Sequence, residues 1–444
     1  MSTIPRSDVA QPSPSRFPSE VGSDVRSSAR IGAKPRNWRV IHACEYARDV
    51  LPVVEGQVTA GMRPYIVTPQ GAGTAELYLA KKDLEQRATL SLLRAWQDVR
   101  NWRKSILECD PENTSDIVHA HSFAAGMAAV RGFSCVVYDL TSCIEEMAIA
   151  SGQCEPGSWM GRSFRVAEQF VLTRAEAVIV HSLGMKSAVE ERGAPKEGVF
   201  LIPEPLSFEE EILLPKSDSL KPDSFYERLG VPAGATTYFV PQFLTDEGEA
   251  LGTAALSVLE AFALLVGELP GSRLLVGATR ARAALFASHL ERLGIRDQVL
   301  LVEDDLVSAA MRNVDVLIAM EQVPADLTIA RQPNEVCLDG LRLGVALLAA
   351  DVPRNRDASP DGRGCLWFNS DDVRDLSHRM AFLGSNPDFR SALANSGRTC
   401  IFETRNSAAV GRKYDAAYRY AINRKKSGGR SNMASLQPAV SANW

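Results

Sequence analysis

The sequence predicts an α/β protein with two doubly wound parallel sheets, and two observations support that prediction. Short apolar runs of strand length alternate with amphipathic helical segments through most of the chain, which is typical of parallel strands joined by crossover helices. The chain has 444 residues, a length that favours two domains over one. We therefore expect two Rossmann-like domains of similar size that face a central cleft.

The first half of the chain has the strand-helix alternation of one such domain. Apolar runs predict strands at residues 38–43, 64–68, 116–121, 134–138, 177–182 and 198–203. Helical periodicity predicts helices at residues 48–59, 75–108, 163–173 and 185–192. Residues 37–206 are therefore expected to form the N-terminal domain.

The second half repeats the pattern after a linker expected at residues 207–235, which is rich in charges and prolines. Strands are predicted at residues 237–240, 273–277, 298–302 and 315–319, and helices at 254–269 and 280–293. Residues 236–400 are expected to form the C-terminal domain, and residues 401–422 a closing helix.

The most informative stretch is residues 331–351, which is typical of a loop, a helix and a buried strand in succession. Pro333 fits the opening of the helix and Gly344 its end. Residues 345–350 form a continuous apolar run, as a strand covered on both faces requires. In open α/β sheets a helix start of this kind lies at the carboxyl ends of the strands, where ligands bind, and it attracts phosphate.

Composition limits the partners and the compartment. The net charge is −5, with no basic excess that would favour nucleic acid, and no apolar stretch is long enough to cross a bilayer. Residues 1–36 and 423–444 have few large apolar residues, so we expect both to be disordered tails. The N-terminal residues lack the apolar core of a secretory signal, so we expect a cytoplasmic protein.

Two further features have a functional and a structural interpretation. The basic run Arg424-Lys425-Lys426 resembles those that hold proteins peripherally at the inner membrane face; we favour the interpretation as a solvated helix end. The eight cysteines match no zinc spacing, so we expect reduced thiols and no metal site.

Several motifs, in order from about residue 38 to residue 420, resemble a glycosyltransferase of the GT-B fold, specifically family 4. The resemblance lies in DIVHAH at 116–121, the strand-serine-helix-glycine-strand block at 174–203, the block at 273–302, the acidic helix with its following strand at 338–357, and the closing helix at 401–418. It implies a retaining enzyme that transfers a hexose from a nucleotide-diphosphate sugar to a glycan or lipid-linked acceptor in polysaccharide biosynthesis, without a metal or other cofactor. The oligomeric state stays open.

The same comparison with the family shows substitutions at the donor end. Gln242 stands where the family has an arginine and Glu247 where it has a lysine, and those two cations stabilise the diphosphate leaving group. The family's two glutamates correspond here to Arg331 and Asp339. Arg331 is expected either to bring its guanidinium to a phosphate or to pair with Asp339 and close the site.

The candidate site residues are therefore His121 and Asp339 for catalysis, with Gly277, Arg280, Arg331 and Asp339 for donor binding. A histidine such as His121 either reaches the sugar from a strand end or merely caps the strand. The Asp339 carboxylate is expected to bind the ribose, and Gly277 to allow close backbone approach. For Arg280 we favour a solvent-facing helix position over a donor contact.

Two functions remain open on these residues. The first is an active glycosyltransferase with altered donor use. The second is a catalytically inactive GT-B protein that acts as a binding or assembly partner in polysaccharide synthesis. The substitutions at Gln242, Glu247 and Arg331 favour the second on chemical grounds, whereas most members of the family are enzymes.

Overall fold

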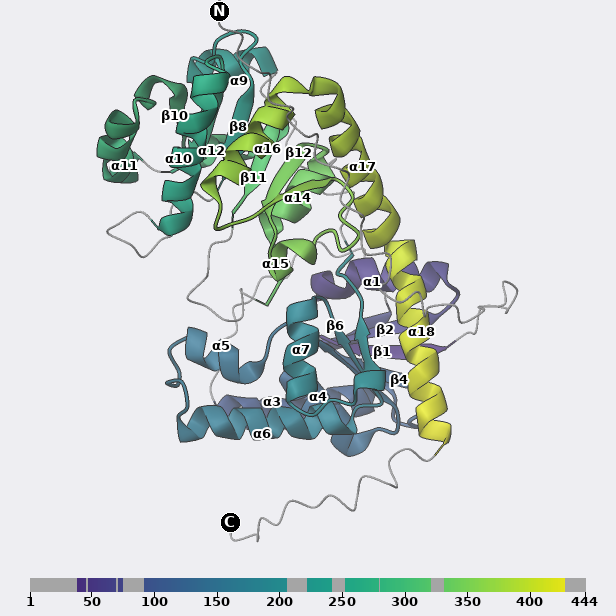
Figure 1. The fold of residues 1–444 in the computed structure, drawn as a ribbon. Coiled ribbons are helices and arrows are strands. Elements are labelled where there is room, and N and C mark those ends of the chain that lie inside the picture. Colours follow the sequence, from purple (N-terminus) through teal and green to yellow (C-terminus); the bar gives the residue numbers. More distant parts are fainter. Residues whose placement is uncertain are drawn as a thin grey trace, which may run out of the picture. The chain divides into compact units, whose positions relative to one another are not determined.

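The computed structural model describes residues 38–44, 47–68, 71–74, 92–205, 222–241, 252–278, 280–320 and 331–427. The chain divides into two compact units, residues 1–36 and 37–444, and the described residues all belong to the second. They contain two sheets, each flanked by helices (Figure 1). We call the sheet near the N-terminus and its helices the first lobe, and the other sheet and its helices the second lobe.

The first lobe has a seven-stranded sheet in the order β3-β2-β1-β4-β5-β6-β7. Its strands are β1 (Arg39–Ala43), β2 (Arg63–Thr68), β3 (Gly71–Thr74), β4 (Ile117–Ala120), β5 (Val136–Leu140), β6 (Ala177–Val180) and β7 (Val199–Leu201). All pairings are parallel except that of β2 with β3. The strand order reverses between β1 and β4, which makes their carboxyl ends the usual place for a ligand.

The helices of the first lobe start where serines follow strands or turns. They are α1 (Ala47–Thr59), α3 (Leu92–Cys109), α4 (Phe123–Gly132), α5 (Ile144–Ala150), α6 (Trp159–Arg174) and α7 (Leu183–Glu191), with the short 3₁₀ turn η1 (Lys196–Gly198). Ser122, Ser158 and Ser182 are the N-caps of α4, α6 and α7, and each side chain accepts a hydrogen bond from a backbone N–H of the first turn.

The second lobe has a six-stranded, fully parallel sheet in the order β10-β9-β8-β11-β12-β13. Its strands are β8 (Thr237–Val240), β9 (Arg273–Gly277), β10 (Val299–Val302), β11 (Val316–Ala319), β12 (Ala346–Ala350) and β13 (Cys365–Phe368). Its helices are α9 (Pro222–Leu229), α10 (Thr253–Glu268), α11 (Arg280–Leu293), α12 (Asp304–Asn313), α14 (Glu335–Leu343), α15 (Pro353–Arg356), α16 (Val373–Ser385) and α17 (Pro387–Arg405), with the 3₁₀ turn η3 (Arg296–Gln298). Together the sheets give the GT-B architecture of two doubly wound domains.

Two of the sequence-based boundaries differ from the observed elements. The expected linker at 207–235 contains α9, whose Phe225 is fully buried against the second lobe. The expected C-terminal tail from residue 423 begins inside a helix, α18 (Ser407–Lys426). Among the described residues, no helix is both long and apolar enough to cross a membrane.

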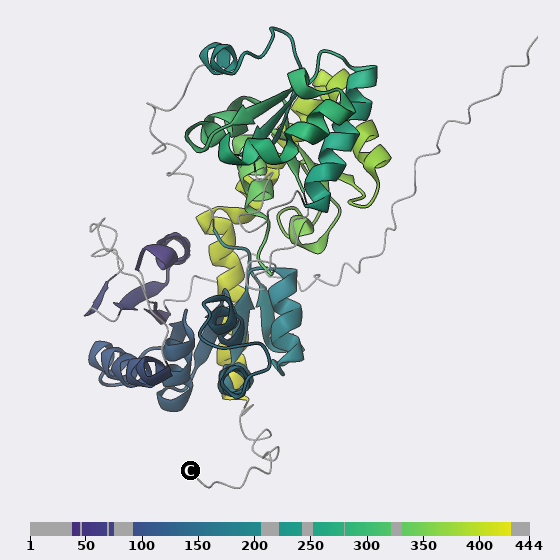
Figure 2. The ribbon, with the colours of Figure 1, turned by 90° about the vertical axis from the view of Figure 1, so that its left-hand side faces the viewer.

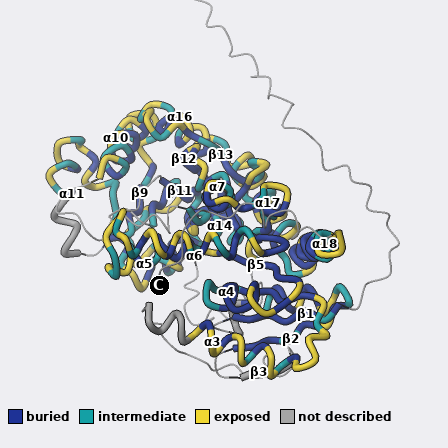
Figure 3. Tube along the Cα trace, turned by 90° about the horizontal axis from the view of Figure 1, so that it is seen from below, coloured by how far each residue is buried: buried dark blue, intermediate teal, exposed yellow. Residues whose placement is uncertain are grey.

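Each sheet is buried on both faces, as the continuous apolar strands require. In β1, Val40 and Ile41 point to opposite faces and belong to two different core clusters. Figure 3 shows the central strands of both sheets mostly in dark blue, with exposed residues concentrated on the helices.

The chain returns to the first lobe through α18. The N-cap Asn406 separates α17 from α18, and Val410, Tyr414 and Tyr418 of α18 are fully buried in one of the first sheet's two core clusters. Figure 2 shows α18, in yellow, running among the helices and strands of the first lobe. The first sheet therefore depends on the last helix of the chain.

Two glycines allow α18 to approach α1 closely. A Cβ on Gly56 would overlap the Ser407 carbonyl oxygen, and a Cβ on Gly411 would lie 2.8 Å from backbone atoms of Gly56. We predict that Gly56→Ala lowers the free energy of unfolding by about 1–3 kcal/mol, because overpacking forces the helices apart.

The matched control is Gly267→Ala in α10, where a Cβ would meet nothing within 4 Å. This change should leave stability equal or raise it, since alanine is favoured in helices by about 0.5–1 kcal/mol. Urea unfolding of both variants measures the difference. Equal stability of the two variants would show that α1 and α18 do not pack as described.

Candidate functional site

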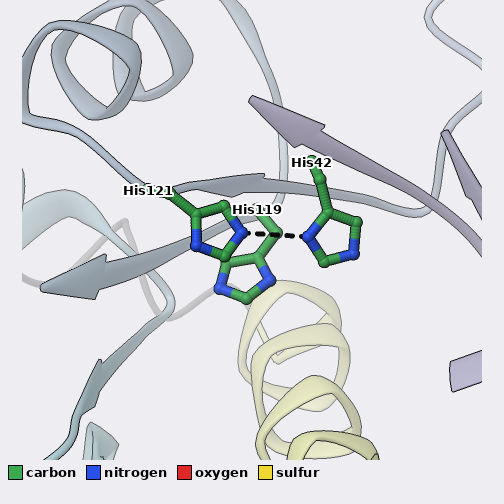
Figure 4. A group of neighbouring side chains, drawn as sticks. All are labelled: His42, His119 and His121. Carbon is green, nitrogen blue, oxygen red and sulfur yellow. Dashed lines mark hydrogen bonds between the residues drawn. The ribbon is translucent and has the colours of Figure 1, made fainter. Parts of the chain in front are cut away.

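Polar side chains gather at the carboxyl ends of the central strands of the first sheet. His42 of β1 and His119 of β4 are register partners, and His121 follows β4. Asp139 lies in β5, and His181 follows β6. Figure 4 shows His42, His119 and His121 with their rings grouped together. Because these strands are parallel, the five side chains lie at the same end of the sheet. We call His42, His119, His121, Asp139 and His181 the histidine cluster.

Asp139 and His181 form the charged centre of this cluster. The Nε2 atom of His181 lies 2.7 Å from Asp139 Oδ1, and its Nδ1 donates to the Ile202 carbonyl oxygen at 2.7 Å. Burial is the largest effect and would lower the pKa of His181, but the charge and hydrogen bond of Asp139, with smaller contributions from Glu204 and the Ile202 carbonyl, together raise that pKa to about 9. His181 is therefore an imidazolium at neutral pH, with a short ion-pair contact to Asp139 at one ring nitrogen and a hydrogen bond to Ile202 at the other.

Asp139 in turn stays ionised although it is buried. Burial would raise its pKa, but the His181 charge and the hydrogen bonds to the carboxylate hold the pKa well below its usual range. Tyr414 of α18 donates to Asp139 Oδ2 at 2.9 Å, and His119 Nε2 lies 3.2 Å from the same oxygen. The last helix of the chain thus supplies part of the carboxylate's environment.

A chain of hydrogen bonds joins the remaining rings. Gln57 of α1 donates to the Tyr418 hydroxyl at 2.8 Å, and its Oε1 lies 2.8 Å from His42 Nε2. The Tyr418 hydroxyl also lies 2.8 Å from His119 Nδ1. His42 Nδ1 lies 2.9 Å from His121 Nε2. These contacts fix the orientation of each ring.

His121 is the ring of the cluster through which a bound molecule has the best access. Its side chain is 14% exposed, whereas His119 has no exposed side-chain surface. Burial and the neighbouring His119 lower the pKa of His121 well below its usual value, so the ring is neutral. Burial, together with His119, likewise lowers the pKa of His42 to about 3. A neutral imidazole with an exposed edge can exchange hydrogen bonds with a hydroxyl group.

Arg331 lies where the two lobes meet. Its Nε lies 3.0 Å from Glu146 Oε2 of α5, and its carbonyl oxygen accepts a hydrogen bond from Ser182. Beside it, the Leu183 backbone N–H donates to Asp357 of the second lobe at 2.8 Å. The start of α7 is therefore held against the second lobe. Arg331 pairs with Glu146 and not with Asp339, the partner proposed as one alternative from the sequence.

Glu146 belongs to a buried cluster of charges. Arg192 Nη2 lies 2.8 Å from Glu146 Oε1, and Arg192 Nε lies 3.7 Å from Glu168 Oε2. Burial raises the pKa of Glu168 to about 7, against the hydrogen bond from the Ile144 N–H and the charge of Arg192. A pocket of about 350 Å³ adjoins the cluster, and Arg331 closes it from the second lobe.

Residues at the start of α14 bind one another. Pro333 precedes the helix and has no N–H, and the N-cap Asn334 accepts from the Val336 N–H at 3.0 Å. Asn334 is itself buried and donates to Asn355 at 2.8 Å. Asp339, one turn further, is paired with Arg342 at 2.8 Å, and its side chain is 40% exposed. Burial of part of the carboxyl raises the pKa of Asp339.

Of the remaining candidate residues, only Gly277 has described surroundings. Gly277 ends β9 and allows close approach of the Pro241 backbone, because a Cβ there would overlap the Pro241 carbonyl oxygen. Arg280 begins α11, and its side chain lies outside the described residues. Gln242 and Glu247 also lie outside them.

Comparisons with known proteins agree with this arrangement. Residues 10–205 match the model of the glycosyl transferase 4-like domain. No curated protein matches the sequence.

Solved structures resemble the fold across most of the chain. A glycosyltransferase from Rickettsia africae is 13% identical, with a TM-score of 0.57 over 87% of this chain and 99% of that one. Anabaena HepE in complex with UDP is 11% identical, with a TM-score of 0.53 over 86% of this chain and 100% of that one. Its complex with UDP-glucose gives a TM-score of 0.52 at 11% identity, over 88% and 100% of the two chains. These likenesses establish the shared fold.

We predict that Asp139→Asn lowers the free energy of unfolding by about 3–5 kcal/mol, because it leaves a buried imidazolium without its partner. The pair's contribution also depends on pH. The pKa of His181 is raised from 6.5 to about 9, so the stabilisation is fully present below pH 6.5 and is lost as the pH rises through about 9.

Urea unfolding below pH 6.5 and above about pH 9 measures the contribution of the Asp139–His181 pair. The wild-type chain should lose more stability than Asp139→Asn between these two pH values. An identical alkaline loss in both chains would contradict the charged pair.

We predict that the two arginines that pair with Glu146 contribute differently to stability. Arg331→Ala should cost less than about 1 kcal/mol, because Arg331 is 27% exposed and Glu146 keeps Arg192. Arg192→Ala should cost about 3–5 kcal/mol, because Glu168 remains buried without a cation and Glu146 keeps only the more exposed Arg331. Thermal and urea unfolding give both values. A loss from Arg331→Ala as large as that from Arg192→Ala would make Arg331 a structural residue.

Proposed function

From a chain that has the GT-B fold and resembles glycosyltransferase family 4, we propose a glycosyltransferase that moves a hexose from a nucleotide-diphosphate sugar to a glycan or lipid-linked acceptor with retention. We place it in the cytoplasm, in polysaccharide biosynthesis. The family model and the neighbours support transfer and sugar-nucleotide use, since HepE is described in complex with UDP and with UDP-glucose. In this proposal the transfer uses neither a metal nor another cofactor.

The observation that carries the proposal is the position of Arg331. It stands at the family's first glutamate position, at the contact between the lobes, and its partner Glu146 holds a second cation, Arg192. A diphosphate could therefore take over the Arg331 guanidinium without leaving Glu146 unpaired. A guanidinium binds phosphate in a fork and stabilises the charge that develops on a leaving diphosphate.

Asp339 and His121 have complementary roles in this proposal. The Asp339 carboxylate is 40% exposed and pairs with its neighbour Arg342 on the same helix, so it can accept hydrogen bonds from both ribose hydroxyls. His121 offers its exposed edge to the sugar or the acceptor from the end of β4. Gly277 and Arg280 complete the donor side.

A second function has its own supporting observation. The start of α14 offers a diphosphate fewer N–H groups, because Asn334 caps that of Val336 and Pro333 has none. With Gln242 and Glu247 in place of the family's cations, this favours a catalytically inactive GT-B protein that acts as a binding or assembly partner in polysaccharide synthesis.

Calorimetry with UDP, GDP and ADP and their hexose conjugates tests the proposal. We predict binding of at least one conjugate, and Asp339→Ala should weaken it about tenfold or more, since a hydrogen bond to a charged group contributes about 1.5–3 kcal/mol. Asp415→Ala is the matched control, because Asp415 also pairs with an arginine on its own helix but lies on α18. It should bind like the wild-type chain.

The outcomes separate the two functions. Donor binding with transfer or slow hydrolysis of the sugar supports the enzyme. Donor binding without either supports the inactive partner. Absence of binding by every nucleotide at millimolar concentration contradicts the first function, and equal affinity of Asp339→Ala and Asp415→Ala contradicts the placement of the donor.

A further inference from the structure

The protons in the histidine cluster can be assigned one after another. Gln57 donates its amide N–H to Tyr418, so its Oε1 is the atom that faces His42 and accepts from His42 Nε2. A neutral His42 then has a lone pair on Nδ1. The proton in the 2.9 Å contact between His42 Nδ1 and His121 Nε2 therefore belongs to His121.

This assignment leaves one unfavourable contact. With its proton on Nε2, a neutral His121 has a lone pair on Nδ1, and that atom lies 3.6 Å from Asp139 Oδ2. Asp139 is 3% exposed, so little water screens a lone pair from a carboxylate there. A second proton on His121 would remove this contact but would place another imidazolium in the same buried site as His181.

From this geometry we propose that His42, His119 and His121 bind one divalent transition-metal ion of the zinc class. The three residues each offer a ring nitrogen within 4.8 Å of the others. If the ion takes the place of the proton between His42 Nδ1 and His121 Nε2, the proton of His121 moves to Nδ1 and can be donated to Asp139. The unfavourable contact then becomes a hydrogen bond.

The surroundings already have the form of a metal site's outer shell. Metal-bound histidines usually donate their other N–H to a carboxylate, a carbonyl or another oxygen. Here Gln57 Oε1 faces His42 Nε2 at 2.8 Å, and Asp139 Oδ2 faces His121 Nδ1. The three candidate ligand atoms are imidazole nitrogens, which favours zinc-like ions over magnesium or calcium, because those prefer oxygen.

Two of the ligands need only small movements, whereas His119 must also give up its contact with the Tyr418 hydroxyl or with Asp139. Tetrahedral zinc with bonds of about 2.0–2.1 Å separates its nitrogen ligands by about 3.3 Å. His42 Nδ1 and His121 Nε2, at 2.9 Å, need to move slightly apart, and the widest pair in the group needs to move together. His121 has the room for this, because its edge is exposed. That edge also leaves one coordination position open to solvent.

The inference shares His121 with the proposed sugar transfer, but its test measures bound metal and not transfer, so the two can fail separately. The test is equilibrium dialysis of the metal-stripped full-length chain against Zn²⁺, with the bound metal measured by mass spectrometry. We expect one ion per chain. His121→Ala should weaken binding at least tenfold, whereas His378→Ala, an exposed histidine of α16, should bind as the wild-type chain does.

A Co²⁺ spectrum of the wild-type chain gives a readout that no variant's folding affects. Cobalt held by three histidines should show intense visible bands of a four-coordinate site and no thiolate charge-transfer band, which would instead point to the cysteines. Circular dichroism confirms that His121→Ala is folded. The inference is overturned if the wild-type chain retains no stoichiometric ion, if His121→Ala retains as much as the wild-type chain, or if the cobalt spectrum is that of a thiolate site.

Discussion

The buried carboxylate of Asp139 is the interaction on which the first lobe depends. It is ionised because His181 carries a charge 2.7 Å away, and its other donor, Tyr414, comes from the far end of the chain. A charge in the interior is stable only when it is paired and hydrogen-bonded. The carboxyl ends of β4, β5 and β6 and the helix α18 must therefore be in place together before the site exists. This requirement explains why α18 returns from the second lobe and why Gly56 and Gly411 allow it to approach α1 so closely.

The contact between the lobes differs from the Asp139 pair, because its charged side chains have more than one possible partner. Glu146 is shared by Arg331 and Arg192, and Arg331 is the more exposed of the two cations. Arg192 is needed to keep Glu146 and Glu168 buried, whereas Arg331 can change partner. In the proposed function, Arg331 is the arginine that an anion binds, in place of the cations that Gln242 and Glu247 replace. The capped start of α14 limits how that anion can bind. Arg331 therefore favours an enzyme with altered donor use, whereas the capped helix start favours an inactive partner.

The sequence predicted the alternation of strands and helices well, because buried parallel strands such as Ala346–Ala350 are continuous apolar runs. It did not predict β3, whose residues Gly71–Thr74 have no strand pattern and are defined by antiparallel pairing with β2. His121 was recognisable from the DIVHAH motif. His119 lies in the same motif, but His42, Asp139 and His181 lie far from it in the chain and are brought to it only by strand order. Tyr418 bonds to His119 across 299 positions, and Arg331 meets Glu146 across 185; no local pattern signals either contact.

The central claim is that one charged pair, with neutral His42 and His121 beside it, organises the site at the strand ends. The ¹⁵N spectrum of the chain labelled at its histidines, recorded near neutral pH without metal, tests this most directly. Each imidazole nitrogen reports whether it carries a proton, and His181→Gln and His121→Ala assign the two decisive signals. The account predicts that both nitrogens of His181 are protonated and that His121 is neutral with its proton on Nε2. A neutral His181, or a doubly protonated His121, would contradict it.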